Sequence, residues 1–128
     1  MRISAVLTAI ACLLGLAPGA HASQVLASPA VYASPNQHSA QCNLGNFGAR
    51  DVPITAFDIV DEAGNAFPVN RGGGISVPAG FVCQISALNI PSGSAVACSA
   101  TVSNGNTVRG SLTLFDGHGV PLRSSELR

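Results

Sequence analysis

The stretch Ala95-Val-Ala-Cys-Ser-Ala-Thr-Val102 predicts the fold, because buried-type and small polar residues alternate along it. Every second residue from Val96 to Val102 is apolar or cysteine, and serine and threonine occupy two of the three positions between them. A period of two residues is typical of a β-strand that buries one face. Cys98 is therefore expected to point into a core, and its disulfide partner decides how that core is joined.

Other stretches repeat this alternation. Their expected inward residues are, strand by strand, Ala40, Cys42 and Leu44; Phe81, Cys83, Ile85 and Ala87; and Val108, Gly110, Leu112 and Leu114. Residues 52–60 are apolar on both faces as far as Asp58, which is typical of a central or covered strand. No stretch of ten or more residues after the N-terminal leader shows the 3.6-residue period of a helix.

Turn residues separate these stretches at intervals of about ten residues, the spacing of a β-sandwich or barrel. Asn104-Gly105 predicts a two-residue hairpin, because both residues of a type I′ turn need positive φ. Two further hairpin turns, of the same kind as each other, are predicted at Asp61–Asn65 and Asp116–Gly119. Loops are expected at residues 91–94 and 70–74, and the second of these is expected to be mobile because it contains three glycines.

The predicted fold class is all-β, an antiparallel immunoglobulin-like sandwich of about seven strands preceded by a signal peptide. The seven strands are expected within residues 24–35, around Cys42, at 54–60, at 66–69, around Cys83, around Cys98 and at 108–115.

The first 22 residues have the pattern of a secretory signal peptide. The apolar run from Ile3 to Leu16 is shorter than the roughly 20 residues that cross a bilayer. It is followed by Ala20-His21-Ala22, a small-x-small site that predicts cleavage between Ala22 and Ser23. An alternative is a lipobox at residues 9–12 with Cys12 as the lipidated residue. We expect a signal peptide at 1–22, one β-sandwich domain at 23–128, and a secreted or periplasmic location.

Charge is sparse, with six arginines, no lysine and six acidic residues among 128. There is no basic stripe, so nucleic acid is not expected as a partner. After the leader there is no second hydrophobic span, so the mature chain is not expected to cross a membrane. A single tyrosine and no tryptophan also weaken a sugar-binding role, which usually needs aromatic platforms.

The sequence does not predict an enzyme. It has no Gly-x-Ser-x-Gly nucleophile motif, and His38 and His118 stand without paired metal ligands. Asp58, Asp61 and Glu62 are expected to be solvated turn acids and not calcium ligands. No catalytic residue, metal or cofactor is predicted.

Several short patterns resemble those of small secreted bacterial β-sandwich proteins of uncharacterised function. They are Cys42-x-x-x-Asn46, the run 54–65 (ITAFDIVDEAGN), the turn 77–80 (VPAG), Cys98, and the run 108–119 (VRGSLTLFDGHG). The resemblance implies a sandwich and an export signal. It implies no activity, because such folds host many functions.

In a sandwich of this order the second and sixth strands face each other, so Cys42–Cys98 is the favoured disulfide and Cys83–Cys98 the alternative. The chain-entropy model values the longer loop at roughly 4 kcal/mol and the shorter at roughly 3 kcal/mol. Cys83 is then left outside the bridge. It is interpreted as a buried thiol that packs like a small hydrophobe, with an intermolecular disulfide or a reactive thiol as alternatives.

Two classes of function fit this sequence. The first is an exported, disulfide-stapled module with a structural or protein-interaction role, whose partner is another envelope or secreted protein. The alternative is a subunit of a cell-surface assembly built by strand addition, with residues 23–37 as a donor arm. The same residues are also interpreted more simply as a first strand after a loose terminus. The oligomeric state is left open.

Overall fold

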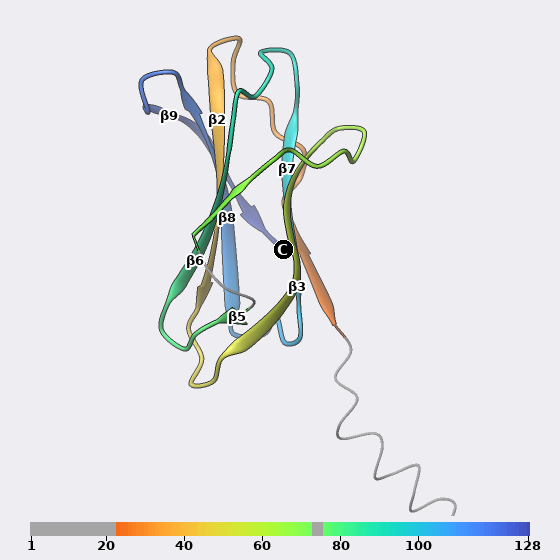
Figure 1. Cartoon of the computed structure of the whole chain (residues 1–128), viewed down its shortest axis with the longest axis vertical. Helices are drawn as coiled ribbons and strands as arrows, with labels where there is room; N and C mark the ends of the chain where they lie inside the picture. The colour runs from red at the N-terminus through yellow and green to blue at the C-terminus, as the bar shows by residue number, and fades with distance from the viewer. Residues whose placement is uncertain (1–22, 73–75) are drawn as a thin grey trace, which may run out of the picture.

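The computed structural model describes residues 23–72 and 76–128, and within them the chain is all-β and antiparallel (Figure 1). One sheet has the strand order β1-β7-β3-β5 and the other the order β4-β6-β2-β8-β9. The strands are β1 (Gln24–Ala27), β2 (Gln37–Asn46), β3 (Val52–Asp61), β4 (Asn70–Gly72), β5 (Ser76–Val77), β6 (Val82–Leu88), β7 (Val96–Val102), β8 (Val108–Asp116) and β9 (Pro121–Leu127).

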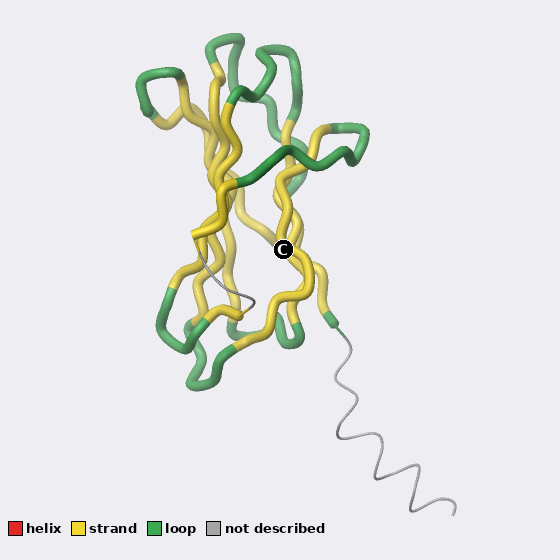
Figure 2. Tube along the Cα trace, viewed as in Figure 1, coloured by secondary structure: helices red, strands yellow, loops and turns green. Residues whose placement is uncertain are grey.

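The two sheets form a β-sandwich with its core between them, and most connecting loops gather at the two ends (Figure 2). The buried apolar residues come from both sheets: Val31, Ala40, Cys42, Leu44, Val52, Phe57, Ile59, Val77, Cys83, Ile85, Ala87, Ile90, Val96, Cys98, Ala100, Val102, Val108, Leu112, Leu114 and Leu127. Burial of these side chains is the main favourable term in folding a domain of this size.

The alternation in the sequence predicted the inward faces of β2, β7 and β8 correctly. The same holds for β6 from Cys83 onward, but the prediction for Phe81 was wrong, since its side chain is 65% exposed. Phe81 precedes the strand and closes a turn: its N–H donates to the carbonyl of Pro78, and Gly80 has φ 77°. Period-two reasoning fails there because the backbone is not extended.

β3 lies between β7 and β5, an interior position that agrees with the central or covered strand predicted from its two apolar faces, but its pairing is uneven. β7 pairs along most of one side of it, whereas the two-residue β5 covers only Val52 and Pro53 on the other side. The register with β7 shifts between Ile54 and Ala56. Such a bulge changes which residues face inward, so apolar residues fall on both alternating positions of the sequence.

Residues 23–72 and 76–128 contain nine strands, where about seven were expected. The strand expected at residues 66–69 is only an isolated bridge between Val60 and Ala66, and the next three residues, expected to be loop, pair with β6 as β4. Gly73 and Gly74, which belong to the glycine loop that was expected to be mobile, lie outside the described residues. β9 was missed because its sequence, PLRSSEL, is mostly polar and the strand is largely exposed.

The hairpin predicted at Asn104-Gly105 does not form. β7 and β8 lie in different sheets, so the connection crosses the sandwich. Neither residue has positive φ; the local turn instead runs from Gly105 to Val108, with a hydrogen bond of 3.2 Å. Both strands already have partners on each side, β1 and β3 for β7, β2 and β9 for β8. Tertiary pairing has thus overridden the local turn preference.

The turns after Asp61 and Asp116 share one geometry, as the sequence predicted. In each, Asp Oδ1 accepts hydrogen bonds of 2.8–2.9 Å from the backbone N–H groups two and four residues later. The Asp N–H donates to the carbonyl four residues later, and the third residue after it is a glycine with positive φ, Gly64 or Gly119. Only this glycine position requires the left-handed conformation.

These hydrogen bonds predict acid sensitivity. They hold the pKa of both Asp carboxyls below the ordinary value of 3.8, chiefly through the N–H of Asn65 for Asp61 and of Val120 for Asp116. A folded-state pKa below the unfolded one contributes stability above pH 3.8 that is lost as the pH falls through the folded pKa. D61N/D116N should therefore flatten the loss of stability below about pH 4, as measured by urea unfolding from pH 7 downward. An unchanged acid profile would contradict this role.

Candidate functional site

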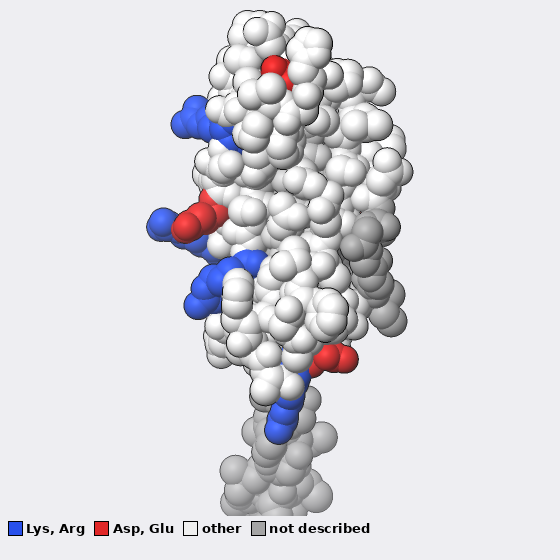
Figure 3. Space-filling view, turned by 90° about the vertical axis from the view of Figure 1, so that its left-hand side faces the viewer, with Lys and Arg blue, Asp and Glu red and all other residues white. Residues whose placement is uncertain are grey.

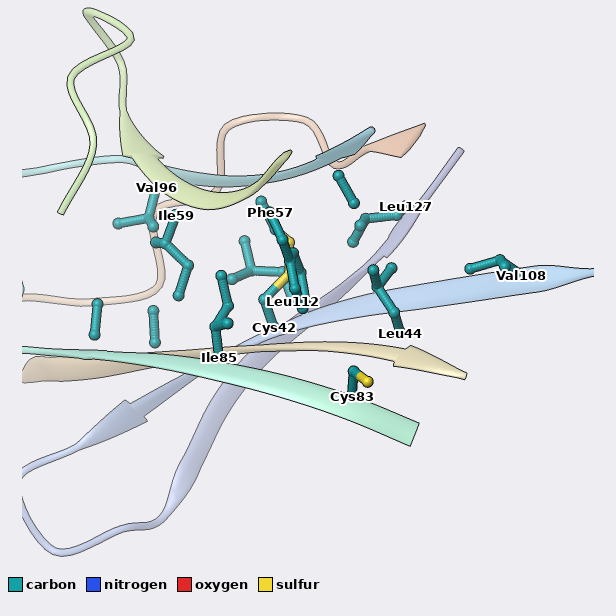
Figure 4. Close-up of a cluster of buried hydrophobic side chains, with 14 of the residues drawn as sticks. Cys42, Leu44, Phe57, Ile59, Cys83, Ile85, Val96, Val108, Leu112 and Leu127 are labelled. Atoms are coloured by element: carbon teal, nitrogen blue, oxygen red, sulfur yellow. A yellow bond between two sulfur atoms is a disulfide. The ribbon is translucent and has the colours of Figure 1, made fainter. Parts of the chain in front are cut away.

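The covalent centre of the molecule is the disulfide between Cys42 on β2 and Cys98 on β7, with Cα atoms 6.1 Å apart (Figure 4). Both residues are fully buried and belong to different sheets, so the bond crosses the core. The favoured pairing from the sequence is therefore the one that the structure contains.

Cys83 lies on β6, beside Leu44 of β2, and takes no part in this bond. Its side chain is 4% exposed, and its thiol donates to the carbonyl of Ser76 at 3.3 Å. Figure 4 places it further along the sheet from the disulfide. The alternative Cys83–Cys98 bond is not formed, and the position matches the expected buried thiol.

Asn46, at the end of β2, organises the loops at one end of the sandwich. Its Oδ1 accepts from the N–H of Gly48 at 2.9 Å and from Thr107 Oγ1 at 3.1 Å. Its Nδ2 donates to the carbonyls of Arg50 and Val77 at 2.7 and 3.0 Å. The sequence pattern contained Asn46 but did not reveal this role, which depends on residues 31 and 61 positions away in the chain.

Gln37 does the same at the opposite end of β2. It is buried, its Nε2 donates to the carbonyls of Pro91 and Ser94, and its Oε1 accepts from the N–H of Ala33. The two ends of one strand thus hold the loops at both ends of the molecule. Buried amides with all partners satisfied fix such loops firmly.

A groove of about 460 Å³ lies on the five-stranded sheet. Its lining residues are Asn43, Gly45, Phe47, Val82, Arg109, Gly110, Ser111, Glu126 and Leu127. Register places Val82, Gly45 and Arg109 in one row across β6, β2 and β8. The next row is Gln84, Asn43, Ser111 and Glu126 across β6, β2, β8 and β9.

One wall of the groove is apolar. Phe47 is 75% exposed and Val82 61% exposed. A Cβ on Gly45 would lie 3.3 Å from the Phe47 ring and 3.7 Å from Val82, so the ring leans over the glycine toward that valine. Phe81, which precedes Val82, is also exposed, but it is not among the residues that line the groove. We call Phe47 and Val82 the apolar cluster.

The opposite wall carries charge. Arg109 Nη1 donates to the carbonyls of Asn106 and Val108 at 3.1 and 2.9 Å, which fixes the guanidinium at the start of β8. Glu126 is paired only loosely with Arg128, at 3.9 Å, and both side chains are strongly exposed. Charge at an exposed rim steers a partner and sets its register more than it adds affinity.

Beyond the groove the sheet surface is mostly polar, with Leu88 of β6 as an exposed apolar side chain. Thr113 and Ser124 lie opposite each other and share a hydrogen bond of 3.0 Å. Figure 3 shows this side of the molecule, most of which carries no charged side chain. A partner therefore meets hydroxyl and amide groups there, with the apolar cluster at one end.

The remaining predicted site residues lie at the expected cleavage site and near the turn after Asp61. Ala22 lies outside the described residues, and Ser23 is the first described residue. In the part of the chain that the structure describes, no three His, Cys, Asp or Glu side chains are grouped so as to hold a metal ion. Asp61 accepts hydrogen bonds within its own turn, and Glu62 accepts one from the N–H of Ala95 at 2.8 Å. Among these same residues no helix is long and apolar enough to cross a membrane.

Comparison of the chain with models of protein families, with curated protein sequences and with solved structures found no match. The functional interpretation therefore rests on the geometry of the fold and its surface.

Removal of the disulfide is predicted to cost far more than removal of the third thiol. The bond spans 56 residues, and the chain-entropy model gives about 4 kcal/mol for that loop. C42A/C98A should lower the free energy of unfolding by about that amount, whereas C83A, which leaves a small cavity, should cost about 1 kcal/mol. Urea unfolding of the three proteins measures both values, and equal losses would contradict the central place of the bond.

Proposed function

We propose that this protein is an exported, disulfide-stapled, immunoglobulin-like β-sandwich without enzymatic activity. It binds another secreted or envelope protein through the groove on its five-stranded sheet. The observation that carries the proposal is the apolar cluster of Phe47 and Val82 at the edge of that groove. Clustered exposed apolar side chains with a polar rim mark protein-interaction sites.

The cluster joins an exposed aromatic ring to an exposed valine. Two of the five phenylalanines of the chain are mainly exposed, and one of them, Phe47, belongs to it. On the strands of the four-stranded sheet, Val25 is the large apolar side chain that is comparably exposed in the described residues. Aromatic side chains are enriched in interface centres and charged ones at rims, which matches the two walls of the groove.

Export is supported by the disulfide together with the predicted leader. Disulfides persist in oxidising compartments and are rare in the cytosol. The sequence predicted a disulfide between the second and sixth strands of the sandwich. These strands are β2 and β7 in the structure, and the disulfide joins them across the two sheets. This cross-sheet position supports the immunoglobulin-like assignment.

Assembly by strand addition is the less well supported alternative. Gln24–Ala27 already pair with β7 of the same chain, and Ala27 and Arg128 exchange backbone hydrogen bonds of 2.9 and 3.0 Å. The longer edge strand, β9, begins at Pro121, and its register shifts beside that residue. Prolines and bulges are devices that keep an edge strand from pairing with another chain.

The proposal is tested by substituting one valine on each sheet. A photo-crosslinking amino acid at Phe47 should yield one defined protein adduct in the producing cell. V82D should reduce that adduct about tenfold, because a charge in the interface centre costs about 1.4 kcal/mol or more. V25D is the matched control, since Val25 is 62% exposed and Val82 61%. It should leave the adduct unchanged.

Two results would overturn this assignment of the surface. One is the same adduct, in equal amount, from a crosslinker placed at Val25. The other is an adduct from Phe47 that V82D and V25D reduce alike.

A further inference from the structure

Asn104-Gly105 is the one Asn-Gly pair in the sequence, and the fold does not use it as a hairpin turn. Asn104 is exposed, and its Oδ1 accepts from the N–H of Asn106 at 3.1 Å. Gly105 is buried, and its N–H donates to Oε1 of Gln24 on β1. A Cβ on residue 105 would lie 2.6 Å from that oxygen, so a larger residue there would displace the end of the Gln24 side chain.

An asparagine followed by glycine has a specific reactivity. The backbone nitrogen of the glycine attacks Cγ of the asparagine, because no side chain on the glycine obstructs the approach. The new N–Cγ bond forms a succinimide, and the Cγ–Nδ2 bond breaks so that ammonia leaves with the proton from the glycine nitrogen. Water then attacks one of the two carbonyl carbons of the succinimide and breaks the bond from that carbon to the ring nitrogen. Attack at the main-chain carbonyl yields isoaspartate, and attack at the side-chain carbonyl yields aspartate.

We propose that Asn104 is a deamidation site and that Gln24 controls it by holding the attacking nitrogen. While β1 is paired with β7, the N–H of Gly105 is engaged with Gln24 and the reaction is slow. When β1 separates from β7, the nitrogen is released and the reaction proceeds. The modification thus records release of the N-terminal strand.

β1 is suited to such local opening. It has four residues, three of which are exposed, and it pairs with β7 along one side. Beyond this ladder the chain is held by the Ala27–Arg128 pair and by two hydrogen bonds of 2.9 Å between Ser28 and Cys98, one to the Cys98 carbonyl and one from the Cys98 N–H to Ser28 Oγ. The Val31–Val96 bridge then fixes the following residues, so opening is expected to be confined to β1 itself. Short strands with few buried apolar groups open more often than the core does.

The product would hinder return of the strand. Either product replaces a neutral amide with a carboxylate in the connection from β7 to β8. Isoaspartate also adds one carbon to the main chain between residues 104 and 105, which displaces the Gly105 N–H from Gln24. The loss of ammonia is therefore irreversible, and so is the displacement of the Gly105 N–H from Gln24.

The experiment compares the purified, oxidised protein with Q24A, Q24E and Q84A during incubation at mildly alkaline pH. Peptide mapping measures the replacement of NH₂ by OH at Asn104, with Asn106 as an internal reference. Loss of one hydrogen bond predicts a roughly 2- to 10-fold faster reaction in Q24A. Q24E keeps an acceptor oxygen and Q84A alters an exposed glutamine elsewhere, so both should react at the wild-type rate.

Three results would overturn the proposal. Asn104 that stays intact even in the reduced, unfolded chain would show that it is no deamidation site. Equal rates in Q24A and the wild type would show that Gln24 does not hold the reaction back. Equal acceleration in Q24A and Q24E would show that strand packing, and not the acceptor oxygen, sets the rate.

Discussion

The disulfide between Cys42 and Cys98 joins an interior strand of one sheet to an interior strand of the other. β2 lies between β6 and β8, and β7 lies between β1 and β3, so each is an interior strand of its sheet. A covalent bond at these positions holds the two sheets face to face at the centre of the core. Such a constraint matters in a small domain, whose net stability is only a small difference between large terms.

The rest of the structure follows from that arrangement. With the two sheets held together at mid-core, β2 can serve at both of its ends as an anchor for loops, through Gln37 and Asn46. Charged residues are sparse in the sequence, and the buried amides of Gln37 and Asn46 are hydrogen-bonded to the loops. On the outer face of the five-stranded sheet, Gly45 has no side chain, and the groove lies there beside the exposed ring of Phe47.

The sequence was sufficient for the strands whose side chains alternate strictly, such as β7 and β8, because period-two burial is encoded locally. It was insufficient where pairing is decided by distant partners. β9 is a strand because β8 offers it an edge, and Asn104-Gly105 is not a hairpin because β8 pairs with β2. Nothing near either segment contains that information.

The candidate groove was missed for a related reason. It depends on Phe47, Val82 and Arg109, which are far apart in the chain and meet only through the register of β2 with β6 and β8. A local signal did exist in Gly45, since a glycine inside a strand pattern often marks a place where something approaches the sheet closely. The disulfide was easier, because three inward cysteines in a sandwich leave few pairings.

The most direct test of this account is to alkylate the thiols of the exported protein before and after unfolding, without reduction, and to map the peptides. We expect no labelling of the folded protein, one label at Cys83 after unfolding, and a linked pair of peptides containing Cys42 and Cys98. A bridge that includes Cys83, within the chain or between two chains, would contradict the core described above.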